Sequence, residues 1–449
     1  MLLLESTRKN NAPCFGHSGA GRPACVICSV LARAAARLLE ASASVVLVLG
    51  VALVLGLFSS SHGGPTGTVS QSDPVFGALM LDGRATSGRL VSLGPGAITL
   101  ASAEGAKHEL PLAQVFKLTR DVSGTVASID RSMLVLPEGD CLMRVTIGSA
   151  SETALDVQSD SLGKLAVPLE SLVGWIMVVP GETDVLDGLW DRVRLEPRKE
   201  EVVWLTNGDR ILGGFLGWDD HRIKMQVKGK PLEIERSGIV GVGFDQALVN
   251  YPKPKSGFLE ITLKDGTRLG LTSARIDDSM VQGTARFDQK IRFPLNELVS
   301  VHVRSPSYDY LTERTPIKTV YFPYIGPPRE FRADRTVDGH FFELSGQSYG
   351  RGVGTQSRTL LAYRLKPEDR RFQALVGVDQ RAGVQGSVIF RVLVDNQERF
   401  ATPPLSSRDA PRSIDVDVTG GEYLILDTGF GDRGNIRDLA DWVEARLVR

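Results

Sequence analysis

The side chains best suited to ligand chemistry gather near the C-terminal end of the chain. Between residues 429 and 442, the sequence GFGDRGNIRDLADW brings aromatic, acidic, basic and amide side chains together in one stretch with turn-forming glycines. A site for a polyhydroxylated ligand such as a sugar needs an aromatic face and a few polar groups that hold hydroxyls. Candidates of these types on predicted turns are Tyr349, Phe430, Asp432, Arg433, Asn435 and Asp438. Trp442 is a further candidate, with core packing as its alternative role.

Two further groups of residues have the types that ligate metals. Asp432, Asp438 and Asp441 offer hard oxygen donors in one stretch and are candidates for calcium, with loop capping as the alternative. Near the N-terminus, the stretch CFGHSGAGRPACVIC holds two closely spaced donor pairs that suit a tetrahedral zinc site. These donors are Cys14, His17, Cys25 and Cys28. The segment between the pairs is shorter than in most zinc sites, so a tail with chance thiols is the alternative.

Catalytic patterns are weak by comparison. The stretch GQSYG matches the G-x-S-x-G pattern around a nucleophilic serine, here Ser348. That pattern needs a helix directly after it and a histidine downstream. A glycine-rich segment follows instead, and no histidine occurs after His340. Asp415 and Asp417 share one face of a predicted strand, but no segment remains for the large barrel typical of glycosidases. The sequence therefore predicts binding without cleavage.

The composition favours β structure and argues against polyanion binding. The 449 residues include 52 basic and 53 acidic side chains, which leaves a net charge of −1. Because no basic field is present, nucleic acid is not an expected partner. Short runs of Val, Leu and Ile alternate with turn signals such as LDG, TNGD and KDG. We therefore expect a mainly β protein.

An apolar segment near the N-terminus is long enough to cross a membrane. Residues 41–58 contain no charged side chain, and about 20 apolar residues span a bilayer core. Arginine and lysine residues precede the segment, which places the C-terminal bulk outside the cytoplasm. We expect residues 1–40 to be a disordered cytoplasmic tail and residues 41–58 to be a transmembrane helix or signal anchor. A cleaved signal and a buried core helix are the alternatives.

An internal repeat occupies the middle of the chain. Four times, a glycine turn is followed by alternating strand patterns, a motif such as PLAQV, PLESL or PLNEL, and a short apolar run. Each repeat has the size of a small five-stranded barrel-like unit, with the motif forming one 3₁₀ turn. The predicted repeats are residues 75–120, 128–180, 200–245 and 257–304. They could form separate beads or two fused pairs, and the uneven spacing of the turn glycines disfavours a β-solenoid. We interpret residues 180–201 and 251–257 as linkers.

The last segment, residues 315–449, has a different pattern. Eight strand-like runs with turn signals between them predict a two-sheet β-sandwich of jelly-roll type. The alternation is clear in SVIFRVLVD, where Val388, Phe390, Val392 and Val394 share one face. The closing stretch RDLADWVEARLVR fits both helical and strand spacing, so periodicity alone leaves its structure open.

Four ordered sequence blocks in this segment carry a family resemblance. They are SYGRGVGTQS, FQALVGVDQRAGVQGSVIFRVLVDNQ, IDVDVTGGEYLIL and GDRGNIRDLADWVEARLV. Together they resemble the NPCBM domain, a carbohydrate-binding module found attached to glycoside hydrolases, over about residues 316–449. The resemblance implies a galactose-binding-like jelly roll. It also implies that RDLADW is a loop, that Trp442 enters the sandwich, and that VEARLV is the final strand.

This chain departs from the family pattern at two places. Relatives usually read G-T-H-A where this chain has GTQS, and D-H-A-D-W where it has DLADW. Gln356 stands at the position of the first histidine and can still donate and accept hydrogen bonds. We therefore include Gln356 among the candidate carbohydrate contacts.

Taken together, the sequence predicts a membrane-anchored, extracytoplasmic, non-catalytic carbohydrate-binding protein of a bacterial cell envelope, in the periplasm or at the cell surface. One alternative is a structural or assembly protein that uses the repeats and a degenerate sandwich for protein–protein contacts. The other is an accessory subunit of a separate glycoside hydrolase. The expected partners are a glycan or glycoconjugate, the membrane through residues 41–58, and a protein such as a glycoside hydrolase. No resident cofactor is expected, and calcium is the one candidate.

Overall fold

The computed structural model describes residues 74–120, 132–150, 153–177, 183–219, 221–324 and 326–449. The predicted tail, the apolar segment 41–58 and the four candidate zinc ligands lie outside these ranges. Within these ranges, no helix has both the length and the apolar character needed to span a bilayer. The described residues belong to one compact unit, Ser70–Arg449.

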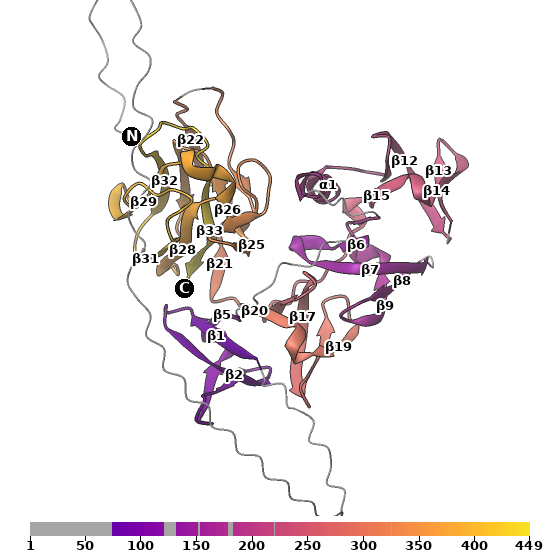
Figure 1. The fold of residues 1–449 in the computed structure, drawn as a ribbon, viewed down its shortest axis with the longest axis horizontal. Helices are drawn as coiled ribbons and strands as arrows, with labels where there is room; N and C mark the ends of the chain where they lie inside the picture. Colours follow the sequence, from indigo (N-terminus) through magenta and orange to yellow (C-terminus); the bar gives the residue numbers. More distant parts are fainter. Residues whose placement is uncertain (1–73, 121–131, 151–152, 178–182, 220, 325) are drawn as a thin grey trace, which may run out of the picture. The chain divides into compact units, whose positions relative to one another are not determined.

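Residues 75–304 fold into four β units that share one strand plan (Figure 1). In each unit the first strand pairs with the second and with the fifth, the second pairs with the third, and the third pairs with the fourth, all antiparallel. The first unit comprises β1 (Val75–Met80), β2 (Ala85–Leu93), β3 (Ala97–Ala101), β4 (Lys107–Pro111) and β5 (Val115–Thr119). The second comprises β6 (Ser132–Val135), β7 (Cys141–Ala150), β8 (Ala154–Ser159), β9 (Gly163–Pro168) and β10 (Gly174–Ile176).

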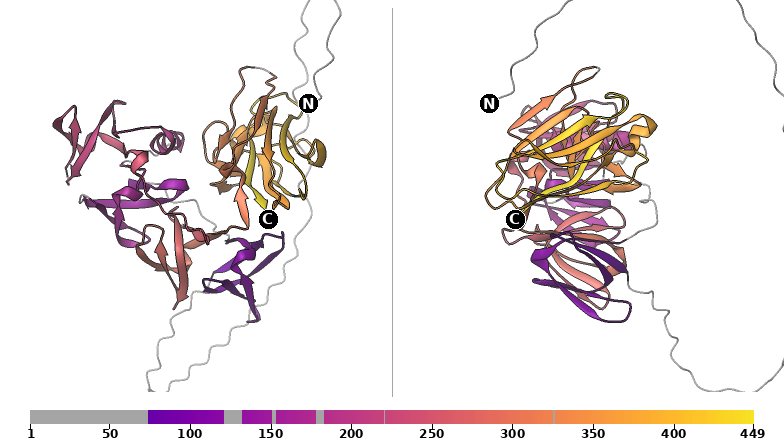
Figure 2. Two further views of the ribbon diagram at one scale, coloured as in Figure 1. Left: turned by 180° about the vertical axis from the view of Figure 1, so that it is seen from behind. Right: turned by 90° about the vertical axis from the view of Figure 1, so that its left-hand side faces the viewer.

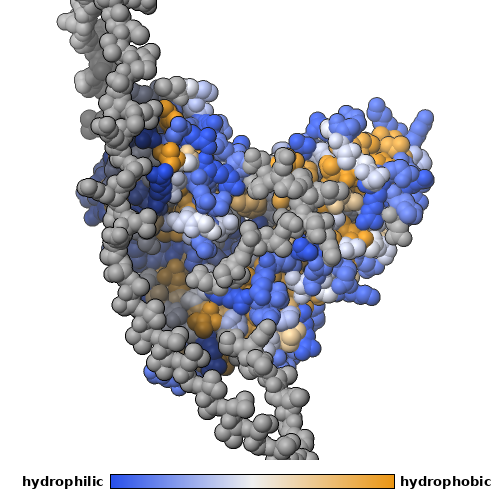
Figure 3. Space-filling view, in the orientation of Figure 1, coloured by the Kyte–Doolittle hydropathy of each residue, from blue (hydrophilic) through white to orange (hydrophobic). Residues whose placement is uncertain are grey.

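The third and fourth units repeat this plan. The third comprises β11 (Glu201–Leu205), β12 (Arg210–Trp218), β13 (Arg222–Val227), β14 (Lys230–Glu235) and β15 (Ile239–Gly243). The fourth comprises β16 (Phe258–Leu263), β17 (Arg268–Asp277), β18 (Met280–Ala285), β19 (Lys290–Pro294) and β20 (Leu298–Arg304). Their ladders follow the same order as in the first unit. Figure 3 shows hydrophobic residues at the surface where Figure 1 places β12–β14, and Leu212, Leu216 and Leu232 are exposed there.

A one-turn helix separates the fourth strand from the fifth in every unit. These 3₁₀ turns are η1 (Leu112–Gln114), η3 (Leu169–Ser171), η4 (Arg236–Gly238) and η6 (Leu295–Glu297). In three units a proline, which cannot donate to a ladder, ends the fourth strand: Pro111, Pro168 and Pro294. Among the described residues no ladder joins a fourth strand to the fifth strand of its own unit. The units are therefore open sheets, and the prediction of barrel-like closure is wrong in this respect.

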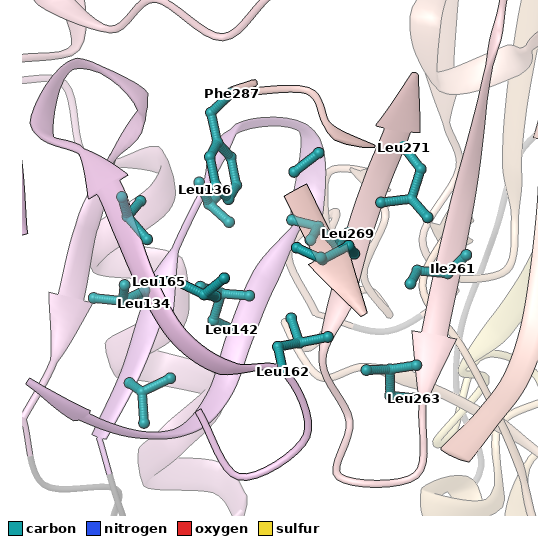
Figure 4. Close-up of a cluster of buried hydrophobic side chains, with 14 of the residues drawn as sticks. Leu134, Leu136, Leu142, Leu162, Leu165, Ile261, Leu263, Leu269, Leu271 and Phe287 are labelled. Carbon is teal, nitrogen blue, oxygen red and sulfur yellow. The ribbon is translucent and has the colours of Figure 1, made fainter. Parts of the chain in front are cut away.

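The units pair through their last strands. β5 pairs with β20, and β10 pairs with β15, so the first unit joins the fourth and the second joins the third. The second and fourth units also meet at Cys141 and Arg268. Figure 4 shows apolar side chains of both of these units, among them Leu142, Leu162 and Leu269, directed into the space between their strands. One continuous buried cluster extends through all four units, so they are fused pairs and not separate beads.

Helix α1 (Thr183–Leu195) occupies most of the segment that we interpreted as a charged linker. Its buried side chains recur at helical spacing, and they pack against strands of the second and third units. They are Leu186, Leu189, Trp190 and Val193. This amphipathic spacing is visible in the sequence. We nevertheless interpreted the segment as a linker, because charged residues separate the apolar ones.

The C-terminal domain is a sandwich of two antiparallel sheets (Figures 1 and 2). One sheet has the order β23 (Arg332–Ala333), β26 (Gly352–Thr355), β33 (Ala440–Val448), β28 (Arg371–Val378) and β31 (Arg412–Asp417), and β21 (Tyr308–Tyr310) also pairs with β33. The other has the order β22 (Lys318–Tyr321), β27 (Thr359–Arg364), β32 (Tyr423–Phe430), β29 (Val388–Val394) and β30 (Gln397–Ala401). A separate hairpin joins β24 (Phe342–Leu344) to β25 (Gln347–Tyr349). Two 3₁₀ helices belong to this part of the chain, η7 (Leu311–Glu313) and the longer, kinked η8 (Gln380–Gln385), whereas η2 (Pro137–Gly139) and η5 (Gln246–Leu248) lie among the β units.

The closing stretch of the chain is a strand. β33 begins at Ala440, two residues before Trp442, so Trp442 belongs to the strand and the preceding loop is shorter than the resemblance implied. Along β29 the side chains of the predicted inner face are buried and those between them are half-buried. The sandwich core therefore forms between the inner faces of the two sheets.

Candidate functional site

The predicted site residues cluster around the loop that joins β32 to β33, at residues 431–439. Asp438 anchors this loop from inside and is fully buried. Its Oδ1 atom accepts a hydrogen bond of 2.8 Å from the amide of Ser387, and its Oδ2 atom accepts one from the Ser357 hydroxyl. Burial raises the pKa of Asp438 to about 6, although both hydrogen bonds act in the opposite direction. Asp438 therefore holds the loop in place, and its buried side chain is not accessible to a ligand.

Trp442 and Asp441 also face inward. The Trp442 ring is fully buried, lies 5.1 Å from the ring of Phe390, and donates from Nε1 to the Thr428 hydroxyl at 3.0 Å. Burial, and then the neighbouring Asp379 carboxylate, raise the pKa of Asp441 well above its ordinary value. Asp432, by contrast, is exposed. The described residues contain no group of three side chains placed to hold a metal ion, so the three candidate calcium ligands are not brought together.

Four predicted residues remain at or near the surface of the loop. Gln356 donates from Nε2 to the carbonyl of Asn435 at 3.1 Å, which leaves its Oε1 atom for other partners. Arg433 is exposed and donates to the carbonyl of Val384 at 2.8 Å. The amide of Asp432 donates to the Ser387 hydroxyl at 3.1 Å, which orients the exposed carboxylate. Phe430 is half-buried at the end of β32.

Tyr349 lies elsewhere. It ends β25, where it packs against a small cluster formed by Phe342, Leu344 and Val443. Its ring lies 5.9 Å from the ammonium group of Lys117, and burial raises the pKa of its hydroxyl to about 12. Ser348 precedes it within the same hairpin, and strand β26 follows, not a helix. A nucleophile elbow is therefore not formed at Ser348.

Two exposed aromatic residues border the loop and were not among the predicted site residues. Tyr324 is 68% exposed, and its ring lies edge to face with Phe430 at 5.8 Å. It also covers Gly434, where a β-carbon would lie 2.7 Å from the tyrosine ring. Phe322 is 52% exposed, and its amide donates to the carbonyl of Arg358 at 2.9 Å. The aromatic-rich stretch YFPYIG at residues 321–326 contains both rings, and it belongs to the first of the eight runs that we predicted as strands.

Arg358 adds a fixed cationic group to this surface. Its Nε and Nη2 atoms each lie 3.2 Å from one oxygen of Asp427, which is buried, so the guanidinium is held by two parallel hydrogen bonds. The guanidinium lies 5.9 Å from the Phe322 ring and remains partly exposed. We refer to Phe322, Tyr324, Gln356, Arg358, Phe430, Asp432 and Arg433 as the loop face.

Comparison with known proteins identifies the domain that carries this face. Residues 325–448 match the NPCBM/NEW2 domain. The C-terminal sandwich is an NPCBM/NEW2 domain. A protein named as an endo-alpha-N-acetylgalactosaminidase of Renibacterium salmoninarum is 25% identical over 111 residues, which cover 25% of this chain and 7% of that protein. An alpha-1,3-galactosidase B of Akkermansia muciniphila is 29% identical over 121 residues, which cover 26% of this chain and 15% of that protein. This chain thus matches a small part of each curated relative.

Solved structures also align with the chain. The CBM51 module of a Clostridium perfringens GH95 protein, in complex with methyl-galactose, is 26% identical and covers 31% of this chain and 99% of its own, with a TM-score of 0.29. The CBM51-2 and INT domains of Clostridium perfringens ZmpB, with GlcNAc, are 20% identical and cover 40% of each chain, with a TM-score of 0.30.

The loop face combines two kinds of group that can contact a polyhydroxylated ligand. The exposed rings of Tyr324 and Phe322 can pack against the apolar side of a pyranose. Arg358, Gln356 and Asp432 offer donors and acceptors for hydroxyl groups beside those rings. Since Asp427 already fixes Arg358, little side-chain entropy is lost when a ligand binds to it.

Proposed function

We propose that this chain is a non-catalytic carbohydrate-binding protein that holds a glycan on the loop face of its NPCBM/NEW2 domain. The observation that carries the proposal is the exposed Phe322 ring, 5.9 Å from a guanidinium that Asp427 holds in a fixed orientation, with the exposed Tyr324 ring two residues further along the chain. An isolated exposed aromatic residue is common on soluble proteins, whereas two of them beside a fixed polar group form a recognition surface.

The relatives narrow the class of glycan. Their names describe enzymes that act on alpha-linked N-acetylgalactosamine and on alpha-1,3-linked galactose. The segment that they share with this chain is a small part of each, so the similarity supports a shared binding module and not a shared hydrolase. We therefore propose terminal galactose or N-acetylgalactosamine as the ligand class. The contacts need no cofactor, and calcium enters as a variable of the test.

The test is a titration of the full chain with galactose, N-acetylgalactosamine and mannose, each with and without calcium. We expect millimolar or tighter affinity for a galactose-type sugar and at least about tenfold weaker affinity for mannose. Tyr324→Ala should weaken binding about tenfold or more, because a stacking ring is removed without disturbing the core. Arg358→Gln should weaken it similarly.

Val384→Ala is a matched control, because it removes another exposed apolar side chain that lies outside the loop face. It should leave the affinity within about twofold of the parent. Equal affinity for all three sugars, or full binding by Tyr324→Ala, would contradict the proposal.

We further propose that the domain faces outward from a bacterial membrane, anchored through residues 41–58. The support is the sequence pattern of basic residues before an apolar segment. The same titration carried out with a polymeric galactan on spheroplasts, from which any outer membrane has been removed, tests this location, because only an outward-facing domain can meet the polymer. A requirement for cell lysis before binding would contradict it.

A further inference from the structure

The described residues enclose a cavity away from the loop face. It is a cavity of about 1480 Å³ whose lining comes from three of the β units, from helix α1 and from the C-terminal domain. No residue of the loop face contributes to the lining. Its charged lining residues include Lys117, Arg194, Glu260, Arg268, Asp334, Arg351 and Glu444.

Most of these charges are paired. Lys117 contacts Glu444 at 2.6 Å, and Arg351 lies 3.4 Å from both Glu260 and Asp334. Arg194 of α1 and Arg268 of β17 differ, because no described carboxylate lies within ion-pair distance of either guanidinium.

The two guanidinium groups lie near each other and are both partly shielded from water. Burial lowers the pKa of Arg194, and Arg268 and Arg351 lower it further, although Asp334 and Asp191 act in the opposite direction. The guanidinium of Arg268 lies 5.8 Å from the Trp190 ring and 5.4 Å from the Phe341 ring. Gly350 makes room for it, because a β-carbon there would lie 2.5 Å from Nη1 of Arg268. Aromatic rings and a glycine thus position Arg268, not an acidic partner.

Arg286 and Arg314, two other enclosed arginines, have acidic partners, whereas Arg446 donates to the side-chain oxygen of Gln373 and to the carbonyl of Glu444. Arg286 is bonded to Glu138 at 2.8 Å, and Arg314 is bonded to both oxygens of Asp369 at 2.7 and 2.8 Å. This pattern is the usual one, because an enclosed charge without a partner is costly. Arg194 and Arg268 line the cavity without a carboxylate at ion-pair distance, so their N–H groups can donate to an anion from solution.

We propose that the cavity is a second ligand site, which binds the oxyanion of a small molecule, a carboxylate or a phosphate, between Arg194 and Arg268. Guanidinium groups hold either anion through paired N–H donors in a fixed plane. The volume exceeds the roughly 300–1,000 Å³ of most small-molecule pockets, so an acidic sugar of more than one residue has room. This site is independent of glycan binding at the loop face.

The test measures anion binding by the full chain at constant ionic strength, with D-glucuronate, inorganic phosphate and chloride as probes. We expect glucuronate, phosphate or both to bind and to raise the melting temperature above that in chloride. Arg194→Gln and Arg268→Gln should each weaken binding about tenfold or more, because each removes charged hydrogen bonds to the anion. Glucuronate binding alone identifies a carboxylate ligand, and phosphate binding alone identifies a phosphate ligand.

Matched controls come from the same elements. Arg192→Gln removes an exposed arginine from the last turn of α1, and Arg275→Gln removes an exposed arginine from β17. Both should retain the parent affinity, and so should Tyr324→Ala, which separates this site from the loop face. If Arg268→Gln fails to fold, Arg194→Gln alone answers the question, since Arg194 lies near the end of α1. Binding no stronger than chloride, or equal binding by Arg194→Gln and the parent, would overturn the proposal.

Discussion

At the scale of single residues, the loop before β33 contains two kinds of polar side chain with opposite tasks. Asp438 is buried and holds the loop through Ser387 and Ser357, whereas Asp432 and Arg433 are exposed on the loop face. A loop that presents ligand contacts must itself be rigid, because motion of the contacts lowers affinity. The buried aspartate therefore supports the face without touching the ligand.

Asp438 should give the protein a measurable pH dependence. Its pKa is about 6 in the folded chain and near its ordinary 3.8 in the unfolded chain, so the folded state binds the proton more tightly. The folded state should thus gain stability as the pH falls from above 6 to below 4. Asp438→Asn carries a neutral amide at every pH. We expect urea unfolding at pH 8 to show this variant more stable than the parent by roughly 1–3 kcal/mol.

The difference between Asp438→Asn and the parent should shrink toward zero at about pH 3, where the parent carboxyl is largely protonated in both states. Asp432→Asn is the control in the same loop, because its side chain is exposed. It should change the stability by less than about 0.5 kcal/mol at either pH. A gap for Asp438→Asn that stays constant from about pH 3 to pH 8 would contradict this explanation.

At the scale of elements, the glycine and proline positions in the sequence predicted the turns and strand ends of each β unit. They did not predict which strands pair between units. The turn glycines Gly83, Gly139, Gly208 and Gly266 all adopt positive φ, between 86° and 89°, as a tight turn between paired strands requires. Proline ends three of the fourth strands, as the repeated motif indicated. The β5–β20 and β10–β15 ladders join edges far apart in sequence, and an edge strand carries no local signal for its partner.

Gly208 offers a direct test of the turn argument. A β-carbon at this position would contact no other atom within 4 Å, so the cost of Gly208→Ala comes from the left-handed φ of 89° alone. We expect this substitution to lower the free energy of unfolding by about 1–2 kcal/mol. Gly238→Ala is the matched control in the same unit, because it is equally open and does not have a positive φ. Equal effects of the two substitutions in urea unfolding would contradict the argument.

At the scale of the whole described chain, the sequence predicted a mainly β protein with a C-terminal sandwich, but not what covers that sandwich. We interpreted the end of the chain as a half-buried strand or a helix, and all nine residues of β33 are buried. One face of β33 contributes Trp442 to the core, and on the other side Val448 packs with Phe116 of the first unit. Amphipathic alternation predicts one covered face. The other face is covered partly by the hairpin residues Phe342 and Leu344, and partly by first-unit residues more than 300 positions away.

The aromatic part of the loop face was missed for a related reason. Tyr324 and Phe322 follow a short strand, and hydrophobic residues in such a run are usually directed into a core. Tyr324 and Phe322 lie at the surface beside the loop because of the register of the β22–β27 ladder and the close approach of Gly434 to the Tyr324 ring. Neither contact can be read from the local sequence. The polar half of the site was only partly readable from residue types on a predicted turn: Asp432 and Arg433 are exposed, whereas Asp438 and Asn435 of the same turn are buried.

An enclosed ion pair, Lys117–Glu444, lies at the contact between the first unit and the sandwich, beside the apolar packing of Phe116 and Val448. The ammonium group of Lys117 lies 2.6 and 2.7 Å from the two carboxylate oxygens of Glu444. Burial alone would raise the pKa of Glu444, but Lys117 and His302 lower it overall, so the carboxylate is charged at neutral pH. Removing either partner leaves the other enclosed charge without compensation, whereas removing both does not.

We therefore expect Lys117→Met and Glu444→Gln each to lower the free energy of unfolding by roughly 3–5 kcal/mol, and the double variant to lose clearly less than the sum. Urea unfolding of the four chains gives the coupling energy. The exposed pair Asp82–Arg84 is the control, with a loss below about 1 kcal/mol for Asp82→Asn. Because the folded pKa of Glu444 is depressed, the coupling should be present above pH 4.5 and disappear as the pH falls further. Strictly additive losses at pH 7 would show that this ion pair does not hold the first unit to the sandwich.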